Sequence, residues 1–149
     1  MNIPSRGSWG NNHEQFGFDY LDAFEKFHGL SNEEAVDLFK GNALYFQELL
    51  YYMLQRPFDF YYECYESYIL SFSAKEDSDG ASAFLDAVFD FLQAEWLEID
   101  QKKTIKMIEA ARYVSERQNF FEADIEIYGD FKERFRERIN KSKNLHSSY

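Results

Sequence analysis

Apolar residues recur every three or four positions along most of this chain, which is the spacing of one face of an α-helix. The first such stretch ends at Gly29, a residue type that commonly follows a helix. Ser31, with Glu34 three residues later, has the pattern of a capping box and predicts the start of a short second helix. Gly41 would end that helix, and Asn42 is suited to cap the next one. The opening of the chain therefore predicts helices joined by short turns.

The same period continues to residue 141. We expect further helices over residues 43–55, 58–73, 84–98, 101–118 and 131–141. Pro57 suits the first position of the helix that it opens, and Asp100 and Asp130 are placed to cap the last two helices. Residues 74–80 form the clearest internal loop. No convincing alternation of a strand is visible. The pattern predicts an all-α, single-domain bundle of six to eight short helices.

The ends of the chain differ from this body. Residues 1–13 are polar and carry Pro, Gly and Asn, so we expect an irregular N-terminal arm, with Trp9 packed on the body. Residues 14–142 form the acidic helical domain, and residues 143–149 are expected to fray.

Composition agrees with a helical domain and limits its setting. The chain has 149 residues with only 7 Gly and 2 Pro, too few for a turn-rich β protein. No apolar run approaches the roughly 18 residues that span a membrane, and no signal peptide is visible. Cys64 is the single cysteine, which excludes an internal disulfide. These features predict a cytoplasmic protein with no membrane partner.

Charge is divided unequally along the sequence. Residues 1–100 carry 19 acidic and 5 basic side chains, a net charge of −14, whereas residues 101–149 carry 8 and 11, a net charge of +3. Such a distribution steers association with charged partners and disfavours direct binding to nucleic acid. We therefore expect a basic protein as the partner. Oligomeric state is not specified by the sequence.

Candidate chemistry is sparse. Glu25 and His28 form one E-x-x-H pair, but a di-iron bundle needs two such pairs, so a helix-terminal histidine is the favoured interpretation. Cys64 has no histidine or basic residue beside it and is expected to be an inert, buried thiol. No P-loop, G-x-S-x-G or H-E-x-x-H pattern occurs, so we predict no catalytic residue, metal ligand or cofactor.

The loop before the helix at residue 84 resembles part of a calcium-binding loop. Alignment on Gly80 places Asp77 and Asp79 at ligand positions, but it places Lys75 at the first one. A lysine there would repel calcium. An acidic turn that caps the following helix is the favoured interpretation.

Carboxylates gather in stripes that suit a binding surface. Asp59, Glu63 and Glu66 follow one face of a predicted helix, and Asp86 and Asp90 follow one face of another. Like charges at such spacings destabilise a helix, so their repetition indicates use in docking a cationic partner, with solubility as the alternative. The predicted partner-binding residues are Asp59, Tyr62, Glu63, Glu66, Asp86 and Asp90. Further acidic faces occur at Asp19 and Asp22 and at Glu33, Glu34 and Asp37.

Two other clusters have two interpretations each. Eleven aromatic residues lie between Tyr45 and Phe72, and they form either a thick core or partly exposed interface rings. The last helix carries Lys132, Arg134, Arg136, Arg138, Lys141 and Lys143. These cations suit either a strip for RNA or phosphate, or docking against the protein's own acidic half, which we favour.

In general character the chain resembles the small acidic immunity proteins that bacteria pair with secreted toxins, although no specific residue carries that resemblance. It implies a protein-binding inhibitor that neutralises a basic toxin, such as a nuclease, by direct binding. The alternatives are a phage-type inhibitor that mimics nucleic acid, and a metal-dependent helical-bundle enzyme that uses Glu25 and His28.

Overall fold

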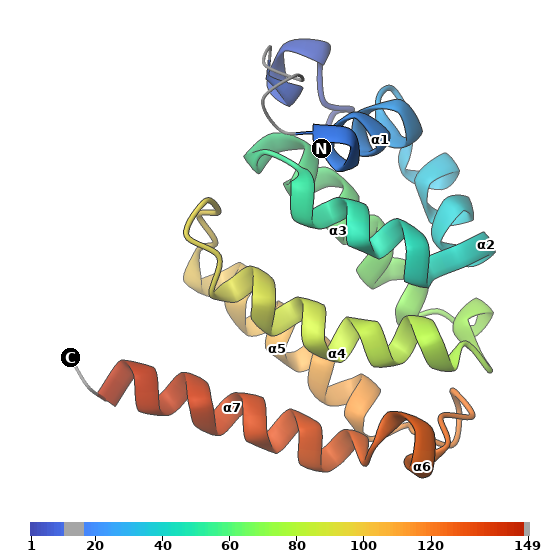
Figure 1. Ribbon diagram of the computed structural model, residues 1–149, viewed down its shortest axis with the longest axis vertical. Helices are drawn as coiled ribbons and strands as arrows, with labels where there is room; N and C mark the ends of the chain where they lie inside the picture. The colour runs from blue at the N-terminus through green and yellow to red at the C-terminus, as the bar shows by residue number, and fades with distance from the viewer. Residues whose placement is uncertain (11–16, 148–149) are drawn as a thin grey trace.

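The computed structural model describes residues 1–10 and 17–147, and every regular element in them is helical (Figure 1). The all-α prediction is therefore confirmed. The α-helices are α1 (Gly17–Phe27), α2 (Asn32–Leu49), α3 (Gln55–Ile69), α4 (Ser78–Leu92), α5 (Gln101–Ser115), α6 (Ile125–Tyr128) and α7 (Phe131–Ser147). Three 3-10 turns accompany them in these described residues: η1 (Arg6–Trp9), η3 (Leu50–Tyr52) and η4 (Phe72–Ala74).

The helices form two groups that meet along α4. α1, α2 and α3 pack together with η1, and α2 also packs on α4. α5 lies behind α4 in Figure 1, and α7 runs along the opposite edge of the molecule from α1. Both α4 and α5 contact α7. The strongly acidic part of the sequence therefore builds one end of the bundle, and the basic part builds the other.

Aromatic rings fill the core. Tyr65 stacks on Phe39 with ring centroids 5.0 Å apart, and Phe58 meets Phe91 edge to face at 4.8 Å. Trp9 is fully buried and contacts Phe24 edge to face at 5.6 Å, so Trp9 packs on the body as expected. Such ring pairs add to the stabilisation that burial of their apolar area provides. The aromatic block is mainly core, although some of its rings reach the surface.

Several predicted helix ends are confirmed. Ser31 and Glu34 form the capping box, because each side chain accepts a hydrogen bond from the backbone N–H of the other residue. Gly29 has a φ of 80°, and Asp100 accepts a hydrogen bond from the N–H of Lys103 at 2.7 Å. Asn42 is non-helical, with φ −161° and ψ 79°, so the expected break there is a kink inside α2.

Other boundaries differ from the prediction. α4 begins at Ser78 instead of residue 84, because Asp77 caps it through a 2.9 Å hydrogen bond from the N–H of Gly80. The acidic turn expected at this place is thus a helix cap. α3 begins at Gln55, which leaves Pro57 third in the helix, where a missing N–H removes no intrahelical hydrogen bond.

The C-terminal end also differs. α5 ends at Ser115 instead of residue 118, and α7 continues to Ser147 instead of fraying from residue 143. The expected boundary between residues 13 and 14 lies outside the described residues.

α2 and α4 approach closely where α4 begins. A Cβ atom on Gly80 would lie 2.9 Å from the Cβ of Ala43 and 2.4 Å from Oδ2 of Asp77. Only glycine therefore fits this crossing, which fixes the distance between α2 and α4 at one end of the cleft described below.

Candidate functional site

Two of the predicted partner-binding residues lie in the interior. Tyr62 is 1% exposed and Glu66 is 4% exposed, and the Tyr62 hydroxyl donates a 2.8 Å hydrogen bond to Oε2 of Glu66. Lys106 Nζ lies 3.5 Å from the other Glu66 oxygen. The expected exposed stripe is therefore wrong at these positions, because α3 is covered by its neighbours on most sides.

The other two predicted residues of α3 are partly covered. Asp59 accepts hydrogen bonds from Lys103 at 2.9 Å and from Gln55 at 2.8 Å. Glu63 is half-buried, and no hydrogen bond or ion pair joins its side chain to another residue in the described part of the chain. α3 consequently offers little free carboxylate surface.

Asp86 and Asp90 on α4 are bound by arginines of α7. Arg134 lies 3.2 Å from Asp86, and Arg138 lies 2.7 Å from Asp90 and 3.6 Å from Asp86. The predicted docking of the last helix on the protein's own acidic half is therefore present. Both aspartates also remain partly exposed, with 56% and 40% of their side-chain surfaces accessible.

The two halves of the charge distribution are joined by these ion pairs. Lys103 and Lys106 of α5 bind Asp59 and Glu66 of α3, just as the arginines of α7 bind α4. Each of these pairs links a carboxylate before residue 101 to a cation after residue 100. Three other cations of α7, Lys132, Arg136 and Lys143, line a groove together with Arg112 of α5.

Carboxylates without a cation lie on the opposite end of the bundle and along α4. The Tyr45 hydroxyl of α2 donates a hydrogen bond to Asp22 of α1, and the Tyr128 hydroxyl donates one to Asp79 at 2.7 Å. The charge of Asp19 raises the pKa of Tyr52, which places Asp19 beside η3. Within the described residues, no ion pair joins Asp19, Asp22, Glu48 or Asp79 to a Lys or Arg.

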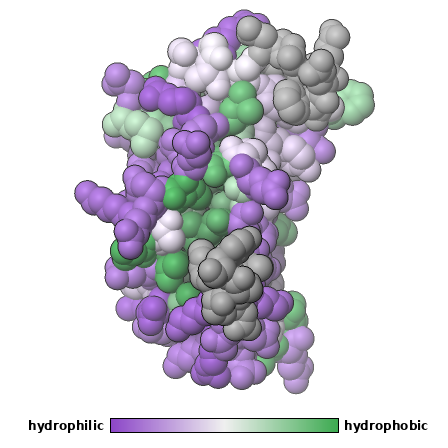
Figure 2. All heavy atoms as spheres, turned by 90° about the vertical axis from the view of Figure 1, so that its left-hand side faces the viewer, coloured by the Kyte–Doolittle hydropathy of each residue, from purple (hydrophilic) through white to green (hydrophobic). Residues whose placement is uncertain are grey.

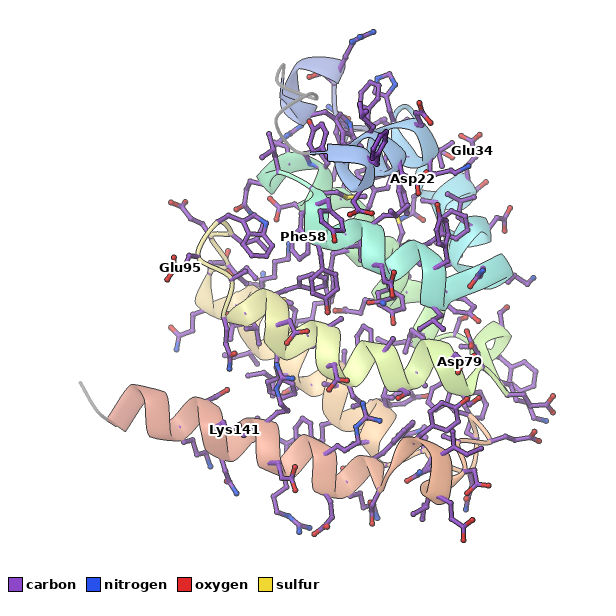
Figure 3. All side chains as sticks on the ribbon, in the orientation of Figure 1. Asp22, Glu34, Phe58, Asp79, Glu95 and Lys141 are labelled. Carbon is purple, nitrogen blue, oxygen red and sulfur yellow. The ribbon has the colours of Figure 1, made fainter. Side chains whose placement is uncertain are left out.

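We call the surface formed by these carboxylates, their tyrosines and the arginine-bound Asp86 and Asp90 the acidic face. It comprises Asp19, Asp22, Tyr45, Glu48, Tyr52, Asp79, Asp86 and Asp90, of which Asp22 and Asp79 are labelled in Figure 3. α2 makes it continuous, because Tyr45 contacts α1 while Leu44 and Gln47 line a cleft with α4.

The tyrosines of the acidic face are neutral donors at neutral pH. The hydrogen bond to Asp22 raises the pKa of Tyr45 to about 12. A neutral phenol orients a carboxylate without removing its charge, whereas a lysine or arginine cancels it. Tyr45 and Tyr52 are 38% and 42% exposed, so they offer apolar area next to the charges.

The cleft between α2 and α4, the α2–α4 cleft, has a volume of about 370 Å³. Its lining includes Asp79, Asp86 and Asp90 of α4 and Tyr51 of η3. Tyr51 donates a 2.7 Å hydrogen bond to Asp90, and burial followed by this bond raises the pKa of Tyr51 strongly. Gln47 also lines the cleft although only 6% of its surface is exposed.

A second exposed region is apolar. Figure 2 shows hydrophobic atoms between hydrophilic areas on the side that lies to the left in Figure 1. A pocket of about 230 Å³ is lined by Tyr20, Tyr51, Tyr52, Met53, Leu54 and Trp96. Tyr52 thus belongs to both the acidic face and this apolar region.

The residues that the sequence offered for catalysis are Glu25, His28 and Cys64. Glu25 and His28 are exposed, and the His28 ring stacks on Phe24 at 4.6 Å. Burial, and then the charge of Glu63, raise the pKa of Cys64 to about 12, so its thiol is a poor nucleophile. No group of three or more His, Cys, Asp or Glu side chains suited to hold a metal occurs in the part of the chain that the structure describes.

Of the residues predicted to bind a partner, Asp86 and Asp90 remain partly exposed, and the sequence also indicated a secondary acidic face at Asp19 and Asp22. Nothing in the sequence indicated that Gln47 and Asp79 belong to one site, since only the α2–α4 crossing brings them together.

None of the helices in the described residues is both long and apolar enough to cross a membrane. No family model, curated protein or solved structure matches the chain.

Proposed function

We propose that this protein is a binding module that captures a basic protein through its acidic face, in the manner of an immunity protein that neutralises a basic toxin. One observation carries the proposal: Asp22 and Asp79 are held by tyrosine hydroxyls and have no cation partner among the described residues. The acidic face is therefore ordered and still charged.

Order and charge together are what fast, specific capture requires. Fixed carboxylates attract a basic protein over long range and raise its association rate. A fixed carboxylate also loses little conformational freedom when the partner arrives. The exposed rings of Tyr45 and Tyr52 add rigid contact area of the kind that dominates binding energy at interfaces.

The internal ion pairs support the same assignment by exclusion. Asp59 and Glu66 are occupied by lysines of α5, and Tyr62 is buried. We therefore assign partner binding to the acidic face. Asp86 and Asp90 of the sequence-based prediction belong to it because 56% and 40% of their side-chain surfaces stay exposed despite their arginine partners, against 27% and 5% for Asp59 and Glu66. The basic groove of α5 and α7 would repel a basic partner, so such a partner is directed to the acidic face instead.

The test is affinity capture from the protein's own cell lysate with a variant that neutralises the face, Asp19→Asn with Asp22→Asn and Glu48→Gln. A matched control, Glu109→Gln with Glu126→Gln and Glu137→Gln, removes the same charge from exposed positions on α5, α6 and α7. We expect the wild type and the control to retain one basic protein in near-equimolar amount at low salt. The face variant should retain at least tenfold less.

A second readout tests inhibition. Equimolar wild-type protein should suppress the activity of the retained protein, and the face variant should not. Equal retention by the face variant and the control would contradict the proposal, as would retention of no basic protein at low salt.

A further inference from the structure

The α2–α4 cleft combines three carboxylates with a buried amide whose oxygen lacks a hydrogen-bond partner among the described residues. Asp79, Asp86 and Asp90 lie seven and four residues apart, so they follow one face of α4. Gln47 of α2 lines the same cleft from the other side, with 6% of its surface exposed. The cleft is therefore a built feature of two packed helices.

In the described part of the chain, the Gln47 side chain makes one hydrogen bond of the four that a glutamine amide can make. Its Nε2 donates to the carbonyl oxygen of Leu44 at 3.3 Å, while its Oε1 has no hydrogen-bond partner in the described residues. A buried acceptor without a donor costs free energy, because it has given up its bonds to water. A ligand that brings N–H donors into the cleft would recover that cost.

We propose that the α2–α4 cleft is a binding site for one lysine or arginine side chain of a basic protein, which rests on the function proposed above and names the group that the acidic face recognises. A lysine ammonium carries three donors and an arginine guanidinium carries five. Asp79 and Oε1 of Gln47 supply acceptors for them, one charged and one neutral.

The surroundings of the cleft select a single cation. Asp79 is bound by the Tyr128 hydroxyl and has no cation partner among the described residues. Asp86 and Asp90 are already shared with Arg134 and Arg138. Those arginines would repel another cation that approached Asp86 or Asp90. The carboxylate left to bind a partner's cation is therefore Asp79.

The cleft walls also suit the stem of such a side chain. Leu44, which is 44% exposed, and Tyr51 both line the cleft. Lysine and arginine carry three or four methylene groups, which pack against apolar side chains while the charged end stays among polar groups. The cleft therefore matches both parts of a long cationic side chain.

The test uses N-acetyl-arginine amide and N-acetyl-lysine amide as probes, with N-acetyl-norleucine amide as the uncharged match. Binding is followed by NMR through the Gln47 side-chain amide and the backbone amides of α4. We expect saturable shifts at Gln47 and Asp79 with the two cationic probes. Asp79→Asn should weaken that binding at least threefold, as should Gln47→Met, which keeps the length of the side chain.

Glu95→Gln is the matched control, because Glu95 is an exposed carboxylate in the loop after α4, away from the cleft (Figure 3). Unchanged affinity in Asp79→Asn, or equal shifts with the norleucine probe, would overturn the cleft assignment. The exposed position of Asp79 keeps this variant informative even where Gln47→Met fails to fold.

The two proposals fail separately. Loss of probe binding with intact capture of the basic protein would remove the cleft and leave the acidic face. Intact probe binding with no captured basic protein would remove the proposed function and leave a site for a cationic side chain.

Discussion

At the scale of single residues, the burial of Tyr62 and Glu66 is the largest difference between the structure and the sequence-based prediction. A carboxylate in an aromatic core costs free energy unless its oxygens are bound. Here the Tyr62 hydroxyl binds one oxygen, and Lys106 lies near the other. An acid that resembles part of a binding stripe in the sequence is therefore a structural element of the core.

Tyr62→Phe tests this role. The variant keeps the ring but leaves one oxygen of Glu66 without its donor, so we expect the free energy of unfolding to fall by about 1–3 kcal/mol. Urea denaturation measures the change. Tyr52→Phe is the control, since the exposed Tyr52 ring should change stability by less than about 0.5 kcal/mol. Equal losses in both variants would contradict a specific role for the buried hydroxyl.

Sequence reasoning could not separate Glu66 from an exposed acid. Asp59, Glu63 and Glu66 share one helical stripe, and spacing alone places all three on one face. Burial of that face depends on α5, whose lysines come from residues more than 35 positions away. Distant packing of this kind leaves no mark in the local pattern.

At the scale of elements, α7 has two sets of cations, one that binds α4 and one that is exposed to solvent. Arg134 and Arg138, one turn apart, bind α4, and Arg134 also donates to Ser82 and to the Tyr128 carbonyl. Arg136 and Lys141 are exposed. The helix buries few apolar side chains, so its docking depends on these arginines more than docking does in the aromatic half.

Neutralising the docking set should loosen α7. In the double variant Arg134→Gln with Arg138→Gln, we expect amide hydrogen exchange in α7 to quicken by roughly fivefold, equivalent to about 1 kcal/mol for these partly exposed pairs. Exchange in α3 should stay unchanged. Arg136→Gln with Lys141→Gln removes the same charge and should have little effect. Similar exchange in the two double variants would show that the docking cations do not hold α7.

The sequence predicted the helix starts at Ser31 and Asp100, where neighbouring residues form the cap. The Ser31 capping box and the Asp100 cap were predicted because each needs only residues within one turn. The start of α4 was missed because its first turn, Ser78–Ala81, is small and polar and resembles a loop. Its helical state depends on Asp77 and on the close crossing of α2 at Gly80.

At the scale of the whole molecule, tyrosine chemistry is tied to folding. Burial is the largest cause of a raised pKa at Tyr51, Tyr61, Tyr62, Tyr65 and Tyr68. Each of these phenols ionises at a lower pH in the unfolded chain than in the folded one. Their contribution to stability therefore stays the same from neutral pH up to about pH 10, the pKa of a phenol in the unfolded chain. It falls as the pH rises further, because the unfolded chain then releases these protons and the folded protein does not.

We expect cooperative alkaline unfolding above about pH 10. Urea midpoints measured from pH 8 to pH 11 should fall steeply above that value, and tyrosinate absorbance at about 295 nm should appear together with loss of helical circular dichroism. Tyrosinate absorbance from these buried rings at unchanged helicity would contradict the linkage.

Gly80 has a consequence for how this chain can diverge. A mutation to any other residue would place a Cβ atom against Ala43 and the Asp77 cap, so it would force α4 away from α2. Most surface positions can drift in a lineage without such a penalty. Selection for the width of the α2–α4 cleft would therefore keep glycine at position 80 and a small residue at position 43 as a linked pair, which marks descendants that retain the cleft.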